Sequence, residues 1–146
     1  MFKKLDSQSK GEIFLKGKGK DMEKRLLGMD AIFNPRSVAV IGASDNPGKL
    51  GSHVMKSLTQ GGFPGRIFPI NPSKDEIMGI KTFPSLLHVS EDIDLSIIVL
   101  PAERVPQTIK GCGEKGVRGI ILITAGFKEI EDKRGEELQK EITELA

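Results

Sequence analysis

The stretch VIGASDNPGKLGSHV, residues 40–54, decides the fold class of this 146-residue chain. Its apolar, β-branched start predicts a buried strand that ends at Gly42, where the backbone must turn sharply. A polar turn follows, and then a helical pattern places Leu50, Val54 and Leu58 on one buried face. A strand that leads into a helix through a glycine-rich turn is the first half of a βαβ unit.

Strand and helix patterns alternate along the rest of the chain. Further strands are expected in GRIFPIN (65–71), near Ile80–Phe83, in DLSIIVLP (94–101) and in VRGIILIT (117–124), and further helices near Ser85–Val89, in AERVPQTIKGCGEKG (102–116) and in EELQKEITEL (136–145). The alternation predicts an α/β fold, a Rossmann-like doubly wound parallel sheet forming a single domain. Val105, Ile109 and Cys112 are expected on a buried helical face, and Ile32 and Phe33 as a cap beneath the sheet.

Composition narrows the class of protein. With 38% hydrophobic and 29% charged residues, the chain is typical of soluble globular proteins. A single cysteine, Cys112, excludes an internal disulfide framework and favours a reducing, cytoplasmic location. No apolar run approaches the roughly 20 residues of a membrane span, so no membrane partner is expected.

Charge is concentrated at the N-terminus. Residues 1–28 carry eight Lys and Arg against four Asp and Glu, and they show little periodicity. We expect a basic, poorly ordered extension there and the domain over residues 29–146. The extension offers almost no aromatic side chains for stacking bases, so no nucleic-acid partner is expected.

Ligands of doubly wound sheets bind outside the carboxyl ends of the strands, at the topological switch point. Four segments are expected to meet there: Gly42–Gly51, Asn71–Lys74, Leu100–Ala102 and Thr124–Phe127. In the first, Gly42, Gly48 and Gly51 are spaced G-x5-G-x-x-G, and the N–H groups from Lys49 to Ser52 open a helix that attracts an anion. This spacing is neither the nicotinamide pattern nor a Walker loop. The alternative is a structural glycine-rich turn without a ligand.

The second segment bears on the identity of a nucleotide. An NAD-binding domain has an acid at the end of its second strand. Asn71 and Pro72 stand there instead, and Asp75 and Glu76 lie beyond the expected place. Lys74 suits a ribose phosphate, either the 2′-phosphate of NADP or the 3′-phosphate of coenzyme A. The alternative is an exposed lysine without a partner.

The third and fourth segments, LPAERV and ITAGFKE, are largely small and apolar. A narrow groove of this kind suits the extended pantetheine arm of coenzyme A better than a nicotinamide ring, which needs a substrate-polarising group nearby. His53, His88 and Cys112 are expected to be packed or surface groups, and the patterns of zinc hydrolases and serine-elbow enzymes are missing from the sequence. We therefore predict no catalytic centre and no metal site.

Three longer segments, NPRSVAVIGASDNPGKLG, GRIFPINPSKDEIMGIKTFPSL and DLSIIVLPAERVPQTIKGCGEKGVRGIILITAGFKE, carry a family resemblance. They closely resemble the N-terminal CoA-binding domain of NDP-forming acyl-CoA synthetases, the α subunits of ADP-forming acetate–CoA ligases, which are related to the succinyl-CoA synthetase α subunit. The resemblance runs from about Met29 to the end. It implies coenzyme A as the cofactor, CoA or acyl-CoA as the ligand, and further ligase domains or a β subunit as partners. The implied role is to hold CoA so that its thiol reaches an acyl phosphate.

The resemblance also implies site residues. It assigns phosphate contacts to Ser44, Gly48, Lys49 and Leu50, a nucleotide contact to Lys74 after Asn71 and Pro72, and pantetheine contacts to Leu100, Pro101, Ile123, Thr124 and Ala125. Compared with succinyl-CoA synthetase, the first loop is longer by a DNP-like insertion. Family members continue into a last strand and a domain with a phosphorylated histidine. We therefore expect this sequence to be truncated before both, and to bind CoA without turnover.

Two other functions stay open at this point. One is a CoA-binding regulatory module, or the leading domain of a protein acetyltransferase. The other is an NADP-binding oxidoreductase domain. Titration with CoA and NADPH would distinguish it from a CoA-binding domain.

Overall fold

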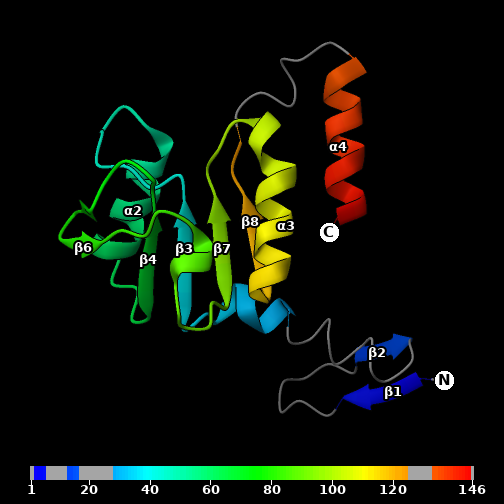
Figure 1. Cartoon of the computed structure of the whole chain (residues 1–146). Coiled ribbons are helices and arrows are strands. Elements are labelled where there is room, and N and C mark those ends of the chain that lie inside the picture. The colour runs from blue at the N-terminus through cyan, green and yellow to red at the C-terminus, as the bar shows by residue number, and fades with distance from the viewer. Residues whose placement is uncertain (1, 6–12, 17–27, 125–132, 146) are drawn as a thin grey trace.

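A four-stranded parallel sheet forms the centre of the computed structural model, which describes residues 2–5, 13–16, 28–124 and 133–145. The strand order is β4–β3–β7–β8, and every strand runs parallel to its neighbour (Figure 1). The bounds are Ser37–Ile41 for β3, Arg66–Ile70 for β4, Leu95–Ile98 for β7 and Gly119–Leu122 for β8. The predicted α/β class and these four predicted strands are confirmed.

Strand β3 is central because it pairs with β4 on one side and with β7 on the other. All five of its residues are buried, and Val38, Ala39 and Val40 have almost no exposed surface. Apolar runs of this kind are typical of parallel strands that are covered on both faces.

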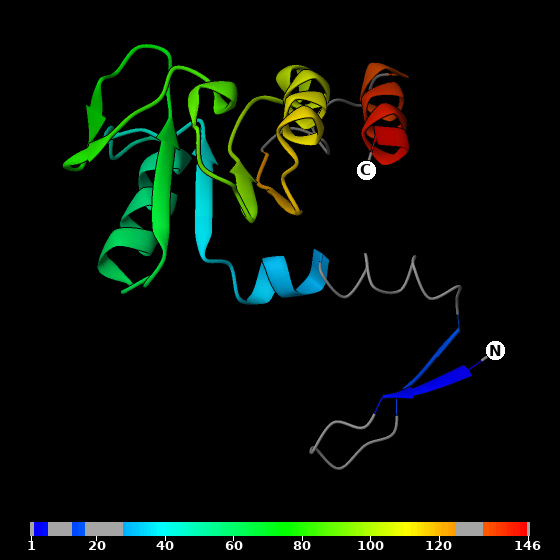
Figure 2. The ribbon, with the colours of Figure 1, turned by 60° about the horizontal axis from the view of Figure 1, so that its bottom comes forward.

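Helices cover both faces of the sheet (Figure 2). Helix α2, Leu50–Gln60, packs through Met55 on the face that carries Val38 and Val40. Helix α3, Val105–Lys115, covers the opposite face, and α4, Lys133–Leu145, packs beside α3. Lys110 Nζ of α3 lies 4.0 Å from Glu141 Oε1 of α4, which adds an exposed ion pair to that contact.

Smaller elements connect the sheet. Strands β5, Glu76–Ile77, and β6, Ile80–Lys81, form a short antiparallel hairpin, and two 3-10 turns, η1 at Leu86–His88 and η2 at Ala102–Arg104, follow β6 and β7. Residues 28–33 are helical. Strands β1, Phe2–Leu5, and β2, Ile13–Lys16, pair antiparallel within the N-terminal extension, where the sequence analysis predicted no strand.

Two packing predictions are wrong in part. On α2 the buried residues are Gly51, Ser52 and Met55, whereas Leu50 is 45% exposed, because the first turn of the helix packs through its glycine and lies at the rim of the sheet. Below the sheet Phe33 is 74% exposed and does not act as a cap. The buried face of Val105, Ile109 and Cys112 on α3 is confirmed.

Among the helices that the structure describes, none combines the length and the hydropathy that a membrane span requires.

Candidate functional site

A cavity of about 880 Å³ opens where the carboxyl ends of the strands meet. Ile41, Ile70, Val99 and Ile123, at or just beyond the ends of β3, β4, β7 and β8, all line it. The connection after β3 leads to β4 on one side of it, and the connection after β4 crosses back to β7 on the other side of β3. The strand order therefore reverses direction at β3. The cavity therefore lies at the topological switch point, where doubly wound folds bind their ligands.

The first loop is shaped by two close backbone approaches. Gly42 has φ = +89°, and a Cβ atom there would lie 2.1 Å from the carbonyl oxygen of Val99. A Cβ atom on Gly51 would lie 2.0 Å from the carbonyl oxygen of Gly42. The first turn of α2 thus packs directly on the end of β3. Gly48 is different, because its φ is not positive and its N–H donates to Asn46 Oδ1 at 2.9 Å.

The N-terminus of α2 is open toward the cavity. Lys49, Leu50 and Gly51 line it. No side chain caps this helix end, and its first turn has no acidic residue. In the part of the chain that the structure describes, the N–H groups of Leu50 and Gly51 have no hydrogen-bond partner. Unpaired amides at a helix N-terminus form a site that favours an anion.

The second loop is tied to the first. Asn71 Nδ2 donates to the carbonyl oxygen of Ala43 at 2.9 Å, and Asn71 Oδ1 accepts from the N–H of Ser73 at 2.8 Å. Lys74 Nζ lies 3.2 Å from Asp45 Oδ2, and this hydrogen bond is the main reason why the pKa of Asp45 lies below its ordinary value. This ion pair connects the second loop to the first, and Lys74 is not among the residues that line the cavity.

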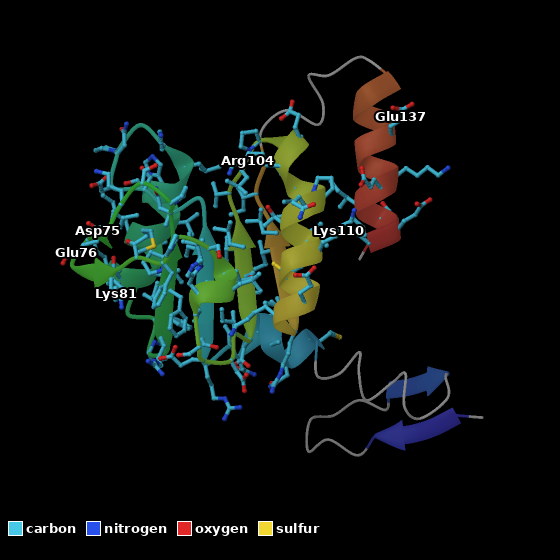
Figure 3. All side chains as sticks on the ribbon, in the orientation of Figure 1. Asp75, Glu76, Lys81, Arg104, Lys110 and Glu137 are labelled. Carbon is cyan, nitrogen blue, oxygen red and sulfur yellow. The ribbon has the colours of Figure 1, made fainter. Side chains whose placement is uncertain are left out.

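The charge of the cavity is positive. Lys49 and Arg104 line it, and among its described lining residues there is no aspartate or glutamate. Asp75 and Glu76 lie beside and in the β5–β6 hairpin, at the side of the sheet in Figure 3, and neither lines the cavity. The carboxylate that would bind the ribose hydroxyls of NAD is thus missing from the described lining.

Large apolar side chains also face the cavity. Leu50 and Leu87 are 45% and 60% exposed, and both belong to the lining. Leu100 and Pro101 add apolar surface from the loop after β7. Exposed apolar side chains gathered in one concave site are typical of a surface that a ligand covers.

The structure brings most of the predicted site residues together. Lining the cavity are Gly42, Ser44, Lys49, Leu50, Gly51, Asn71, Pro72, Leu100, Pro101 and Ile123. Gly48, Lys74 and Thr124 are not part of the lining. The Thr124 hydroxyl is buried without a hydrogen-bond partner among the described residues. Ala125 lies outside the described residues.

One wall of the cavity was not predicted from the sequence. This wall consists of Ser85 just before η1, Leu87 in η1, Arg104 at the end of η2, and Gln107, Thr108 and Gly111 along one face of α3. Positions 104, 107, 108 and 111 are spaced i, i+3, i+4 and i+7, which places them on one helical face. This spacing could have identified the wall from the sequence. This face lies beside the buried face of Val105, Ile109 and Cys112, which the same helical periodicity had predicted.

Three groups that could perform chemistry, His53, His88 and Cys112, are not among the residues that line the cavity. His53 is exposed, and His88 is exposed with its Nδ1 2.7 Å from Ser85 Oγ. Cys112 is buried under α3, and burial raises the pKa of its thiol, which disfavours the nucleophilic thiolate. Within the described ranges, no cluster of three His, Cys, Asp or Glu residues could hold a metal ion.

Comparison with known proteins agrees with this geometry. The family model described as CoA binding domain matches residues 36–146. The chain is 50% identical over 112 residues to an ADP-forming acetate–CoA ligase of Methanocaldococcus jannaschii, covering 77% of this chain and 15% of the relative. It is 45% identical over 120 residues to subunit alpha of ADP-forming acetate–CoA ligase II of Pyrococcus furiosus, covering 81% of this chain and 25% of the relative.

Solved structures give the same grouping. The dinucleotide-forming acetyl-coenzyme A synthetase 1 of Ca. Korarchaeum cryptofilum, in complex with phosphate and ADP, superimposes with a TM-score of 0.71 and 38% identity. The match covers 80% of this chain and 25% of that one, so the chain spans about a quarter or less of these relatives. With the family model covering most of its length, the chain belongs to the CoA-binding domain family, whose cofactor is coenzyme A.

Proposed function

We propose that the cavity at the carboxyl end of the sheet holds coenzyme A as part of an ADP-forming acyl-CoA synthetase, and that it presents the CoA thiol to an acyl phosphate. The observation that carries this proposal is the open N-terminus of α2, facing a cavity that has two cations and no carboxylate in its described lining. CoA is a polyanion with a long, mostly uncharged arm, so it suits a cavity that is cationic at one part and apolar at another.

The phosphates belong at the start of α2. The free N–H groups of Leu50 and Gly51 can donate to pyrophosphate oxygens, and the positive end of the helix dipole favours their charge. Lys49 adds an ammonium group from the same turn, and Ser44 lines the same part of the cavity. Such charge-assisted hydrogen bonds are stronger than those between neutral groups.

The pantetheine arm belongs along the loops after β7 and β8. Leu100 and Pro101 supply apolar surface there, and Ile123 lines the cavity from the end of β8. In the reaction we propose, the thiol sulfur attacks the acyl carbonyl carbon, a C–S bond forms, and the C–O bond to the phosphate breaks. The thiol proton must pass to a base. Because no Asp, Glu or His lines the described cavity, we expect that base to come from another domain or subunit.

Isothermal titration calorimetry on this chain tests the proposal. We expect CoA to bind in the micromolar range and NADPH to give no comparable heat. Raising the salt concentration should weaken CoA binding, because exposed charges are screened. Lys49→Ala should also weaken it, whereas Lys56→Ala, an exposed change on the same helix outside the cavity, should not. Tighter binding of NADPH than of CoA would instead support an oxidoreductase domain, and binding of neither would refute the proposal.

A further inference from the structure

An apolar surface lies at the end of the sheet opposite to the cavity. The helical segment before β3 carries three exposed apolar side chains, Met29, Ile32 and Phe33, and none of them lines the cavity. Figure 1 shows this segment at the amino ends of the strands. Exposed apolar clusters of this kind are typical of interaction surfaces, so we treat these three residues together as the amino-end patch.

A groove of about 470 Å³ opens beside Phe33. It is lined by Phe33 and Pro35 before β3, by Leu58 and Phe63 at and after the end of α2, and by buried side chains of β3 and β7. Asn34 is the one polar residue of its described lining, and no charged residue belongs to that lining. The groove therefore suits an apolar side chain and offers no group that would hold a charged ligand.

The segment that carries Phe33 is fixed on the sheet. A Cβ atom on Gly119 would lie 2.9 Å from Ile32 Cγ1, so the helical turn packs directly on the start of β8. Just after the turn, the N–H of Arg36 donates to Asp94 Oδ2 at 2.9 Å. Phe33 is nevertheless 74% exposed. An apolar side chain presented on a fixed segment loses little backbone freedom when a partner covers it.

The amino-end patch places a projecting side chain and a groove side by side. In a two-fold dimer the same surface of each protomer faces its copy, so every contact forms twice. Phe33 of one protomer can then enter the groove of its partner, while the partner's Phe33 enters the groove of the first. A surface that carries both halves of a contact is self-complementary.

The charges around Phe33 fit the same symmetry. Asp30 and Arg36 lie three residues before and three residues after Phe33, and both are exposed. A two-fold axis near Phe33 brings Asp30 of one protomer toward Arg36 of its partner, on both sides of the axis. Each group has capacity left for this pair. Asp30 Oδ1 accepts from Asn34 Nδ2 at 3.2 Å, which leaves Oδ2, and the Arg36 side chain is 87% exposed with only its Nε near a carboxylate, 3.9 Å from Asp94 Oδ2.

We propose that the amino-end patch is a self-association surface, through which two copies of this chain form a two-fold dimer with each Phe33 seated in the groove of its partner. This inference does not depend on the proposed function, because the cavity lies at the other end of the sheet and stays open in both protomers. A covered phenylalanine buries about 150–250 Å², so two of them supply only part of the roughly 1,200 Å² of a stable interface. We therefore expect a weak dimer with a dissociation constant on the order of 10–100 μM.

Sedimentation equilibrium of the chain between about 5 and 500 μM tests the proposal. The average mass should rise with concentration from that of one chain toward that of two. Phe33→Ser removes the projecting side chain and should weaken association at least about tenfold. Met78→Asn, which changes an exposed apolar residue of the β5–β6 hairpin outside the patch, is the control and should leave association unchanged. Circular dichroism checks that the variants are folded.

Charge reversal tests the symmetry of the contact. Arg36→Glu and Asp30→Arg should each weaken the dimer about fivefold or more, because each places like charges together twice. The double variant restores opposite charges and should recover the association of the unmodified chain within about twofold. Added salt should reduce these differences, since the charges are exposed.

A chain that sediments as a monomer at every concentration refutes the proposal and leaves the patch to a different partner, such as another domain of a longer ligase. A dimer that Phe33→Ser does not weaken also refutes it, because the contact then lies elsewhere. Single charge reversals without recovery in the double variant refute the two-fold pairing of Asp30 with Arg36. Calorimetry with CoA separates the two proposals: Phe33→Ser should bind CoA as the unmodified chain does, and a lack of CoA binding by both chains would refute only the proposed function.

Discussion

Replacing Gly51 by alanine should reverse the usual effect of this substitution in a helix. Glycine to alanine in an open helical position stabilises a protein by about 0.5–1 kcal/mol. At position 51 the new Cβ atom would lie 2.0 Å from the carbonyl oxygen of Gly42, whereas ordinary contact begins at 3.4 Å. The first turn of α2 and the end of β3 must therefore separate by about 1.4 Å.

The size of the effect follows from these two opposing terms. Overpacking costs about 1–3 kcal/mol, and the upper end applies here because both groups belong to the main chain. After the helical preference of alanine is subtracted, we expect a net loss of about 2 kcal/mol in the free energy of unfolding. For a chain of this size the midpoint of thermal unfolding should fall by about 4–8 °C.

Gly113→Ala is the matched control, because position 113 lies in α3, is exposed, and has no atom within 4 Å of a Cβ. It should raise the midpoint by up to about 4 °C. Gly51→Ala should also weaken CoA about tenfold or more, since it displaces the free N–H groups of Leu50 and Gly51. Thermal unfolding followed by circular dichroism, with calorimetry for CoA, measures both effects. A Gly51→Ala variant as stable as Gly113→Ala would refute the described approach of α2 to β3.

Two further substitutions test other parts of the structure, and the first is measured in two ways. Lys74→Ala should weaken CoA far more than dephospho-CoA in calorimetry; equal losses would show that Lys74 does not read the 3′-phosphate. The same variant should raise the pKa of Asp45 in an NMR titration, because the hydrogen bond from Lys74 lowers it. The stabilising effect of that carboxylate is present above its ordinary pKa and is lost as the pH falls through the lowered value. An unchanged Asp45 pKa would mean that the pair does not form in solution. Met78 has φ = +51° beside Gly79 at +77° in the β5–β6 turn, so Met78→Asn should stabilise the chain by up to about 1 kcal/mol in urea unfolding, and a loss of stability would contradict this.

Sequence patterns predicted the sheet well because parallel strands require continuous apolar runs. The segments SVAVIG and DLSIIVLP carry this signal on both faces, and both became strands. The loops that follow them were predicted to meet, since the carboxyl ends of parallel strands share one edge. This topological rule placed Gly42, Asn71 and Leu100 in one cavity without any knowledge of their contacts.

The failures concern which way side chains face. Leu50 fits a helical stripe by its spacing, but the close approach of Gly51 to β3 turns the first helical turn so that Leu50 faces the cavity. Phe33 is apolar, yet it lies outside the core, which hydrophobicity alone does not reveal. The ion pair between Lys74 and Asp45 was not predicted either, because it joins two loops and the spacing within either loop does not encode it; the binding role of Lys74 stays a prediction.

Residues of α3 and the turn before it that pack in the core and residues that line the cavity occupy different positions. The apolar residues of α3 pack against the sheet, while the neighbouring residues Arg104, Gln107, Thr108 and Gly111 line the cavity. None of these four residues belongs to the buried core, so we expect a small library at these positions to change ligand binding while the fold is kept. For the same reason, mutations that accumulate at these positions during evolution can change ligand binding while the stability of the fold is kept.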